Sequence, residues 1–490
     1  MEPLVKTPQV VVWTRGILFE PKETGTFKGN VGYAIAAQVV SLGSSVLTSL
    51  VVPKILGVES FGYWQLFVMY VGYMGILLFG IHDGVFLRLG GERIDHLDRS
   101  RVKAEYLLVL VFQVIVAVFI TLFALFSGLD NDRVEIFALV CLCAMLVNPA
   151  QFLFYIFRAV NIPNLYSRAT LASQSAYTVF LLVAVSFQLA EYRAYLVAYI
   201  CAQSVAIVIC YLYARPILKV STGKMGLAMR DVAEDVKAGM KVTLAYYAGT
   251  LVVGIGRMMI DAHWGIEAFG KFSFSISLVN FLLAFAAQVA MVAFPVVKRM
   301  DGEKSKEVFL VMRRILFVLM PLVYVLYYPA CILLEIWLPQ YSDSLRYLAI
   351  ILPICVFDFK IQLLVNTYLK ALRKENAMLW INASCLIFSA ALTAIGVFVI
   401  GNIYWAAGLM VLSIAIRSCV AEAYLSKFIG GSCIRYLASE IALAVFFVAS
   451  ALAFSSPLPT CVAVLVYYAV NAKQLKIFVH DVRRLVGGCS

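Results

Sequence analysis

Polar and charged side chains inside one long apolar run are the first candidates for chemistry in this sequence. Asp358, Gln362 and Asn366 recur at i, i+4 and i+8, so a helix would place them on one face. Lys360 lies in the same run, two positions from Asp358, and the two charges therefore point to nearly opposite sides. Since they cannot neutralise each other directly, at least one needs a partner on another helix or in water.

This run has two interpretations. In the functional one, Lys360 attracts an anionic group and Asp358 takes up a coupling ion, H+ or Na+. In the other, Lys360 extends its side chain to the headgroups of one membrane surface. At about 1.5 Å per residue, Lys360 lies roughly 24 Å along a helix that begins at Ser344.

A second polar face lies earlier in the chain. Arg257 and Asp261 are spaced to pair at i, i+4, and an unpaired charge in hydrocarbon would cost at least about 2.5 kcal/mol. The functional interpretation is a cation at the mouth of a cavity, and the alternative is a pair that reaches the membrane surface. The face comprises Thr243, Tyr247, Thr250, Gly254, Arg257 and Asp261.

Other polar positions are weaker candidates, because small and polar residues at helical spacing mediate helix packing more often than they contact a solute. His82, Asp83 and Arg88 precede a basic loop that would bind anionic headgroups, although its charge equally fits a role in membrane orientation. The candidate ion-coupling residues are Asp358, Asp261 and Asp83, and no catalytic residue, metal ligand or cofactor site is predicted. The candidate substrate contacts are Arg257, Lys360, Asp358, Gln362, Asn366, Gln38, Asn280, Tyr247 and Arg158.

The elements that carry these residues follow from composition. Of 490 residues, 63% are apolar and 14% charged, whereas a soluble domain has about 25% charged residues. Runs such as residues 107–125 are apolar on every face, which favours helices over the alternating pattern of a β-barrel. We therefore predict an all-α polytopic membrane protein with about fourteen transmembrane helices, at residues 30–52, 61–82, 104–128, 135–157, 168–189, 194–214, 238–260, 270–297, 308–334, 344–369, 376–399, 403–426, 433–455 and 458–476.

Lysine and arginine are distributed unevenly among the predicted connections. Thirty-three of the forty lie in the two tails and in every second connection, six lie in the opposite set, and Lys360 lies within a span. Because positively charged loops stay on the cytoplasmic side, both termini are predicted to be cytoplasmic. The net charge of +12 then reflects topology and requires no nucleic-acid partner. The eleven cysteines lie mostly in apolar runs and are interpreted as buried thiols.

A short internal repeat predicts the domain organisation. The segments from Gly57 to Gly62 and from Gly265 to Gly270 are identical at four of six positions and lie 208 residues apart. Six predicted spans separate the copies, so the halves have the same orientation, with an axis along the membrane normal. We predict two like-oriented six-helix lobes plus two C-terminal helices. The divisions are a cytoplasmic N-terminal tail (1–29), an N-lobe (30–214), a cytoplasmic linker (215–237), a C-lobe (238–430), the last two helices (431–476) and a cytoplasmic tail (477–490).

Three segments carry a family resemblance. They run from Val52 to Tyr63, from Gly80 to Gly91 and from Trp337 to Tyr341. In these segments the sequence resembles bacterial polysaccharide and O-antigen flippases of the multidrug, oligosaccharidyl-lipid and polysaccharide exporter superfamily. The similarity extends from Asn30 to the last span.

The resemblance implies twelve to fourteen helices in two six-helix lobes around a cationic cavity, with alternating access driven by an ion gradient. It implies that the substrate is an undecaprenyl-pyrophosphate-linked oligosaccharide, such as a repeat unit of O-antigen or exopolysaccharide. It further implies the bacterial inner membrane as location, and membrane lipids, a polymerase and a chain-length regulator as partners. No cavity residue is transferred from the family, so the candidate residues above depend on the sequence pattern alone.

Two other classes of function remain open. A multidrug exporter would share the fold, and cationic drugs would favour acidic residues deep in the cavity, where Asp358 is the clearest example. A membrane polysaccharide polymerase or acyltransferase would favour a long outer loop or a histidine within the bilayer. The predicted outer connections are short, and the four histidines, His82, His96, His263 and His480, fall near interfaces or outside the spans.

Overall fold

The computed structural model describes residues 39–160, 162–298, 302–372, 374–429, 434–454 and 456–478. Across these ranges the chain is helical and contains no β-strand. Ten helices are long and apolar enough to cross a membrane, or twelve if each of two bent pairs is one span. The prediction of an all-α polytopic membrane protein is therefore confirmed, while the count of fourteen spans stays a prediction. Gln38 and the tails at 1–29 and 479–490 lie outside the described residues.

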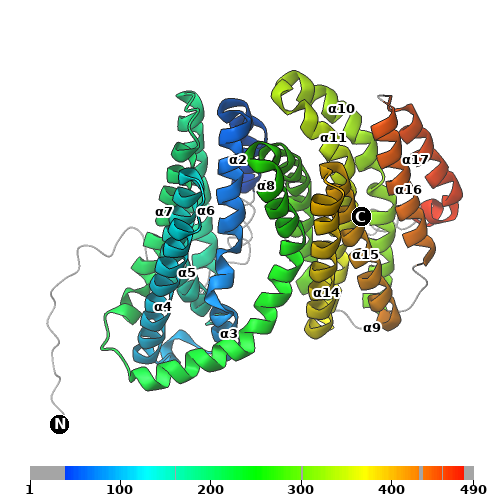
Figure 1. Cartoon of the computed structure of the whole chain (residues 1–490). Coiled ribbons are helices and arrows are strands. Elements are labelled where there is room, and N and C mark those ends of the chain that lie inside the picture. The colour runs from blue at the N-terminus through cyan, green and yellow to red at the C-terminus, as the bar shows by residue number, and fades with distance from the viewer. Residues whose placement is uncertain are drawn as a thin grey trace, which may run out of the picture.

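The N-half, residues 39–218, supplies the helices on the left of Figure 1 and part of its centre. Helices α4 and α5 begin at aspartate caps, since Asp98 and Asp130 accept the backbone N–H groups of Arg101 and Arg133 at 3.1 and 2.8 Å. Its elements are a π-helical turn (Leu47–Val51), α2 (Val52–Tyr73), a 3-10 segment (Met74–Leu78), α3 (Ile81–Arg88), a 3-10 turn (Ile94–His96), α4 (Arg99–Phe126), α5 (Asn131–Ala159), α6 (Pro163–Ser186) and α7 (Tyr192–Leu218).

The C-half, residues 225–429, begins with α8, which runs along the lower edge of Figure 1 and then turns up into the centre. Helix α8 packs against α2, α3 and α4 of the N-half and against α11 and α14 of its own half, so it forms the seam between the halves. The C-half contains α8 (Met225–Lys298), α9 (Gly302–Leu319), α10 (Leu322–Trp337), a 3-10 turn (Pro339–Tyr341), α11 (Ser342–Ile351), α12 (Pro353–Lys360), a π-helix (Ile361–Val365), α13 (Asn366–Ala371), α14 (Glu375–Ala394), a π-helix (Ile395–Val399) and α15 (Ile403–Ile429). Helices α16 (Ile434–Ala453) and α17 (Leu458–Val470) follow.

Several predicted spans are interrupted. The span predicted at 61–82 ends at Leu78, and a turn through Phe79 and Gly80, both with positive φ, leads into the separate helix α3. The span predicted at 308–334 is divided at Pro321 into helices α9 and α10. The span predicted at 344–369 is bent by 45° at Pro353. Proline causes such breaks because it lacks a backbone N–H and its ring clashes with the preceding turn. The predicted linker, 215–237, is largely helical, since α7 continues to Leu218 and α8 begins at Met225.

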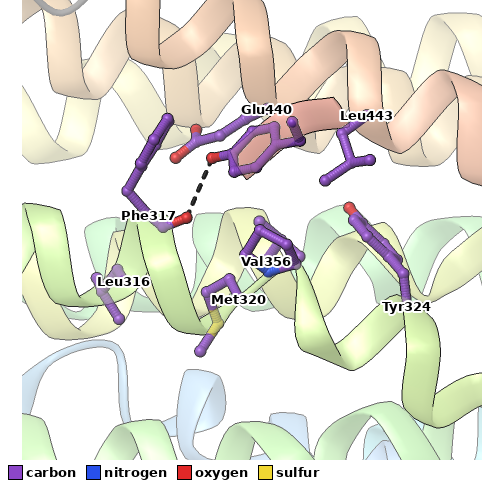
Figure 2. A pocket seen from close by; sticks show the side chains of 9 residues that line it. Leu316, Phe317, Met320, Tyr324, Val356, Glu440 and Leu443 are labelled. Atoms are coloured by element: carbon purple, nitrogen blue, oxygen red, sulfur yellow. Dashed lines mark hydrogen bonds between the residues drawn. The ribbon is translucent and has the colours of Figure 1, made fainter. Parts of the chain in front are cut away.

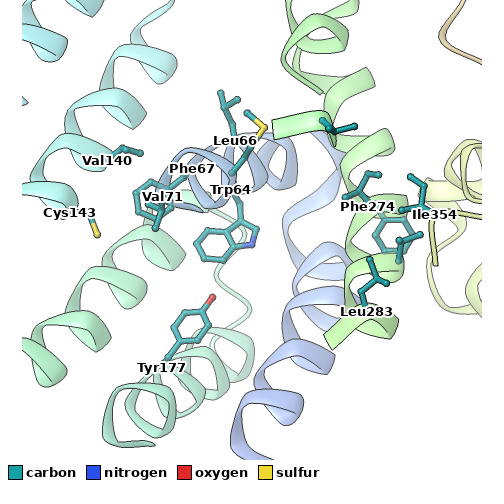
Figure 3. Close-up of a cluster of buried hydrophobic side chains, with 14 of the residues drawn as sticks. Trp64, Leu66, Phe67, Val71, Val140, Cys143, Tyr177, Phe274, Leu283 and Ile354 are labelled. Atoms are coloured by element: carbon teal, nitrogen blue, oxygen red, sulfur yellow. The ribbon is translucent and has the colours of Figure 1, made fainter. Parts of the chain in front are cut away.

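One aromatic and aliphatic core extends through both halves, and Figure 3 shows part of it. In the N-half the Trp64 ring lies 6.2 Å from Phe67 and 6.5 Å from Tyr177, both stacked on it. In the C-half Phe274 and Ile354 are buried on facing helices. Because hydrocarbon provides no hydrophobic force between helices, this close packing is a main source of cohesion in the bundle.

The two copies of the internal repeat form matching breaks that touch each other. Gly57 has φ 72° and ψ 178°, and Gly265 has φ 78° and ψ −176°, a conformation that residues with a Cβ rarely adopt. A Cβ on Gly62 would lie 2.6 Å from the carbonyl oxygen of Ile266, and a Cβ on Gly270 would lie 2.6 Å from that of Val58. Since Val58 and Ile266 occupy equivalent repeat positions, the contact is reciprocal, as a local two-fold axis requires. We call this end of the bundle the glycine end and the opposite end, at α3, the α3 end.

Substitution of Gly270 with leucine is expected to separate the halves at the glycine end, because the atom in the way is a backbone oxygen that cannot rotate aside. With the native cysteines replaced and spin labels at positions 129 and 336, both exposed, electron double resonance should show a longer distance in the G270L variant. Gly72→Leu is the matched control, since nothing lies within 4 Å of a Cβ there. If the distance between the labels is the same in G270L as in G72L, the close contact between Gly270 and the Val58 carbonyl is contradicted.

Candidate functional site

Each of the three segments that carry the family resemblance contacts the other half of the protein across the seam. At the glycine end, the segment from Trp337 to Tyr341 joins the N-half at the broken start of α2. Pro53 and Gly57 interrupt the helical hydrogen bonding there, which leaves carbonyl oxygens available. Trp337 Nε1, Gln340 Nε2 and Tyr341 Oη donate to the carbonyl oxygens of Leu50, Pro53 and Gly57 at 2.8, 3.1 and 3.1 Å. Lys54 Nζ lies 3.4 Å from the centre of the Trp337 ring.

Arg257 lies on the seam between the halves and is 7% exposed. Its Nε donates to Ser273 Oγ at 3.2 Å, its Nη2 donates to Gln65 Oε1 of the N-half at 3.4 Å, and its guanidinium lies 5.0 Å from the Phe269 ring. Among the described residues no carboxylate pairs with it. Neutral partners orient this cation but do not compensate its charge.

Asp261 does not pair with Arg257, which corrects the i, i+4 pair expected from the sequence. Its Oδ1 accepts from Arg133 Nη2 of α5 at 2.6 Å, and Arg133 also holds Asp130 at 3.1 Å. Residues four apart on a helix are near enough to pair, but a better aligned guanidinium from another helix wins here. Asp261 is therefore part of a bridge between the halves at the glycine end.

Tyrosine hydroxyls and glycines interlock along the middle of the seam. The Tyr73 hydroxyl donates to the Thr250 carbonyl at 3.5 Å and lies 2.1 Å from where a Gly254 Cβ would be. The Tyr247 hydroxyl lies 2.1 Å from the corresponding position of Gly75. The predicted face of α8 therefore does contact the opposite half, and Gly254 of α8 and Gly75 of the N-half each make room for a tyrosine from the other half.

At the α3 end, Asp83 is the polar contact between the halves. Its Oδ2 accepts from Thr243 Oγ1 of α8 at 2.6 Å and lies 3.5 Å from His82 Nε2. Gly80, Gly84 and Gly239 bring the two backbones together, since a Cβ on any of them would meet main-chain atoms within 2.5 Å. No arginine or lysine pairs with Asp83 in the part of the chain that the structure describes.

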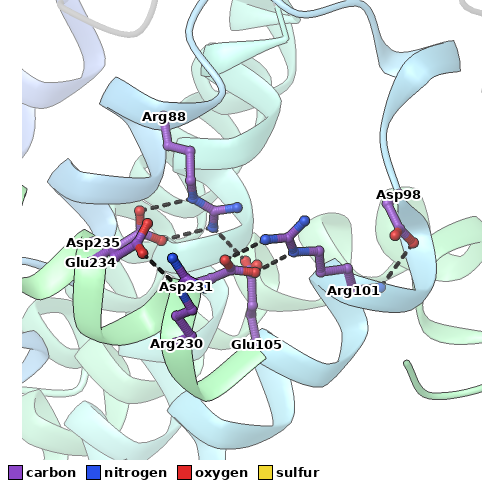
Figure 4. A network of polar contacts seen from close by, with 8 residues as sticks. All are labelled: Arg88, Asp98, Arg101, Glu105, Arg230, Asp231, Glu234 and Asp235. Carbon is purple, nitrogen blue, oxygen red and sulfur yellow. Dashed lines mark hydrogen bonds and ion pairs between the residues drawn. The ribbon is translucent and has the colours of Figure 1, made fainter. Parts of the chain in front are cut away.

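A second charge cluster fixes the first turns of α8 to the N-half, as Figure 4 shows. Arg88 bonds both oxygens of Asp235, at 2.9 and 2.8 Å, and also Glu105 at 2.8 Å. Arg101 forms a two-bond pair with Asp231. These bidentate pairs are the strong type of ion pair, so Arg88 and, from the basic loop predicted to bind headgroups, Arg101 are used inside the protein.

The C-half encloses a cluster of charges away from the seam. Lys360 is 2% exposed and pairs with Glu422 of α15 at 2.7 Å and with Glu440 of α16. Arg313 of α9 lies 3.6 Å from Glu422. Figure 2 shows Glu440 beside a small apolar pocket between α9, α10 and α16. Lys360 therefore does not extend to a membrane surface, and its charge is compensated by carboxylates.

Asp358 finds a different partner. It pairs with Arg417 of α15, whose Nη1 donates to the Gly249 carbonyl of α8 at 3.0 Å. Asn366 and Arg417 line the same small cavity. Gln362 is half-buried and has no side-chain hydrogen bond within the described residues. The π-helix at Ile361–Val365 adds a residue to the turn, so the i, i+4, i+8 face expected from the sequence is not maintained.

The sequence prediction missed the partners of these charges. Arg417 and Glu422 lie inside the span predicted at 403–426, and Glu440 inside that at 433–455. Both Arg313 and Arg417 belong to the cytoplasmic set in the charge count, although the structure buries them in helices. Acidic residues inside those two apolar runs were the available signal, because a buried cation requires them.

The remaining candidates are separated from these clusters. Asn280 is exposed and makes no hydrogen bond to another described residue. Arg158 is exposed at the end of α5, with aromatic rings around it. The structure thus brings Arg257 and Tyr247 to the seam, Asp358 and Lys360 into the C-half, and Arg158 to the α3 end.

Comparisons with known proteins agree with this fold. Residues 27–301 match the family described as polysaccharide biosynthesis proteins. The structure is similar to the lipid II flippase MurJ in an inward closed conformation, with a TM-score of 0.63 and 12% identity over 93% of this chain and 100% of that one. It is also similar to an inward-facing multidrug resistance transporter of the MATE family, with a TM-score of 0.60 and 14% identity over 81% and 98% of the two chains.

A third similar structure is a transporter of the MOP superfamily from Pyrococcus furiosus, with a TM-score of 0.51 and 12% identity over 82% of this chain and 95% of that one. No curated protein sequence matches the chain. At these identities the structural similarity shows the fold, which is that of MOP-superfamily transporters. The family match covers more than half of the chain, and together with the contacts made by the three resemblance segments it shows that this membrane protein belongs to the family of polysaccharide biosynthesis proteins.

Proposed function

We propose that the protein is a flippase that moves a polyprenyl-pyrophosphate-linked oligosaccharide across the bacterial inner membrane. The single observation that carries the proposal is Arg257, a buried cation on the seam that has hydroxyl, amide and aromatic neighbours but no carboxylate partner among the residues that the structure describes. A site that keeps an uncompensated guanidinium inside a membrane is suited to a phosphate-bearing ligand. The family match supports a substrate of polysaccharide biosynthesis.

The conformation supports alternating access between the halves. At the glycine end, three side chains of the segment 337–341, the Arg133–Asp261 pair and the reciprocal glycines all join the two halves. With both termini in the cytoplasm, as the charge distribution predicts, this closed end faces outward. The α3 end, where Asp83 and Thr243 also join the halves in this conformation, opens to admit the substrate, and the contacts at the glycine end break when the halves rock the other way.

Ion coupling is assigned to Asp83 in this proposal. Of the three predicted carboxylates, Asp358 pairs with Arg417 and Asp261 with Arg133, whereas the described partners of Asp83 are Thr243 and His82. A carboxylate without a fixed cation can bind H+ or Na+ reversibly. Because Thr243 belongs to the other half, occupancy of Asp83 by an ion would change a contact across the seam.

Transport in reconstituted vesicles tests the proposal. Proteoliposomes that contain the purified protein and a polyprenyl-pyrophosphate-linked oligosaccharide should expose the glycan to an external, membrane-impermeant glycosidase faster than protein-free vesicles. An imposed pH or Na+ gradient should accelerate this initial rate. A rate equal to that of protein-free vesicles, under every gradient, would exclude the flippase.

A multidrug exporter is the second candidate, because similar folds occur in multidrug resistance transporters. Ethidium efflux in the same vesicles distinguishes the two. The charge of Arg257 disfavours a cationic drug on the seam, so we expect glycan translocation without ethidium efflux.

A further inference from the structure

A second uncompensated arginine lies at the α3 end. Arg158 is the penultimate residue of α5, and its side chain is exposed. Its guanidinium lies 5.0, 5.4 and 5.7 Å from the ring centres of Tyr155, Tyr166 and Phe86. These rings come from α5, α6 and α3, so three helices of the N-half hold one cation between aromatic faces.

No ion pair with a described residue accounts for the charge of Arg158. Two other arginines at this end have carboxylate partners, since Arg88 pairs with Asp235 and Glu105 and Arg101 pairs with Asp231. The described neighbours of the Arg158 guanidinium are aromatic side chains. A guanidinium positioned by rings keeps its planar set of N–H donors directed at a ligand, which is the geometry that binds phosphate with two bonds.

This arginine adjoins the seam. The Tyr155 ring contacts His82 edge-on at 4.7 Å, and the neighbouring Asp83 holds Thr243 of α8. Tyr247 lies one turn further along α8 from Thr243 and precedes Arg257 by ten residues, or about 15 Å along the helix.

We propose that Arg158, with the rings of Phe86, Tyr155 and Tyr166, is a loading site for the pyrophosphate group of the lipid-linked substrate, which it holds before transfer to Arg257. The inference rests on the proposed flippase function and adds a first station at the entrance of the seam. The aromatic rings keep carboxylates away from the guanidinium, so the incoming diphosphate is its counter-ion. Asp83 lies beside this station, where ion binding would weaken the repulsion of the diphosphate.

Binding of farnesyl pyrophosphate to the purified full-length protein in nanodiscs tests the loading site. Arg158→Gln should weaken this binding at least about tenfold, a loss typical of a charge-assisted contact. Arg193→Gln is the matched control, because Arg193 is exposed at the opposite end and pairs with Asp132, Glu135 and Glu191. Inorganic pyrophosphate should compete with the probe in the wild-type protein, whereas farnesol should not. Thermal melting of R158Q verifies that it is folded.

Two outcomes would overturn the loading site. Folded R158Q that binds farnesyl pyrophosphate as tightly as the wild type would show that the arginine does not hold the diphosphate. Competition by farnesol equal to that by farnesyl pyrophosphate would show that the prenyl chain carries the binding. Failure of the flippase proposal is distinguishable, since wild-type vesicles would then translocate no glycan whether or not Arg158 binds the probe.

Discussion

Arg257→Gln should reduce glycan translocation in proteoliposomes at least about tenfold while the folded protein becomes no less stable. The guanidinium is buried, and among the described residues its polar and aromatic contacts are with neutral side chains, Gln65, Ser273 and the Phe269 ring. Burial of an uncompensated charge in a membrane costs at least about 2.5 kcal/mol, so its removal relieves the folded state. A stabilised protein with impaired transport is the combination expected for a residue kept for function.

The initial rate of translocation and the melting temperature of the same R257Q preparation are the two measurements. Arg257→Lys keeps the charge but loses the planar donor set, so its rate should lie between those of the wild type and R257Q. A structural arginine would behave in the opposite way, with a lower melting temperature and a normal rate in the surviving folded protein. That pattern would remove Arg257 from the pathway and with it the main support for the flippase.

Lys360→Met should have the largest effect on stability. Lys360 lies between Glu422 and Glu440, and its removal leaves two buried carboxylates with only Arg313 nearby. Breaking a buried ion pair by removal of one partner costs about 3–5 kcal/mol, because the other charge remains in a low-dielectric environment. The K360M variant should therefore melt well below the wild type in detergent and should lose the attachment of α16 to α12.

The triple variant K360M/E422Q/E440Q is the matched control. It removes the uncompensated charges together with the lysine, so most of the lost stability should return. Melting temperatures of the wild type, K360M and the triple variant form the comparison. Equal melting of K360M and the wild type, or a triple variant no better than K360M, would mean that this cluster does not stabilise the C-half.

Local sequence properties predicted the class of fold and several of its details. Apolar runs of membrane-spanning length determine helices because backbone groups in hydrocarbon must bond within their own segment. The repeat at Gly57 and Gly265 identified both backbone breaks, since only glycine adopts their conformation without strain. The offset of Asp358 and Lys360 on a helix predicted that at least one needs a partner on another helix or in water, and in the structure both have one, Arg417 for Asp358 and Glu422 and Glu440 for Lys360.

The identity of those partners was decided only by tertiary structure. Glu440 lies 80 positions from Lys360 in the sequence. Asp261 pairs with Arg133 on α5 and not with Arg257 on its own helix. Helical periodicity specifies which residues share a face, but it does not specify which helix packs on that face. The sequence therefore determined that charges are buried in this membrane protein, whereas packing decided which are compensated. In the part of the chain that the structure describes, packing gives Arg257 and Arg158 no carboxylate partner, because charge compensation depends on neighbours that are distant in the chain.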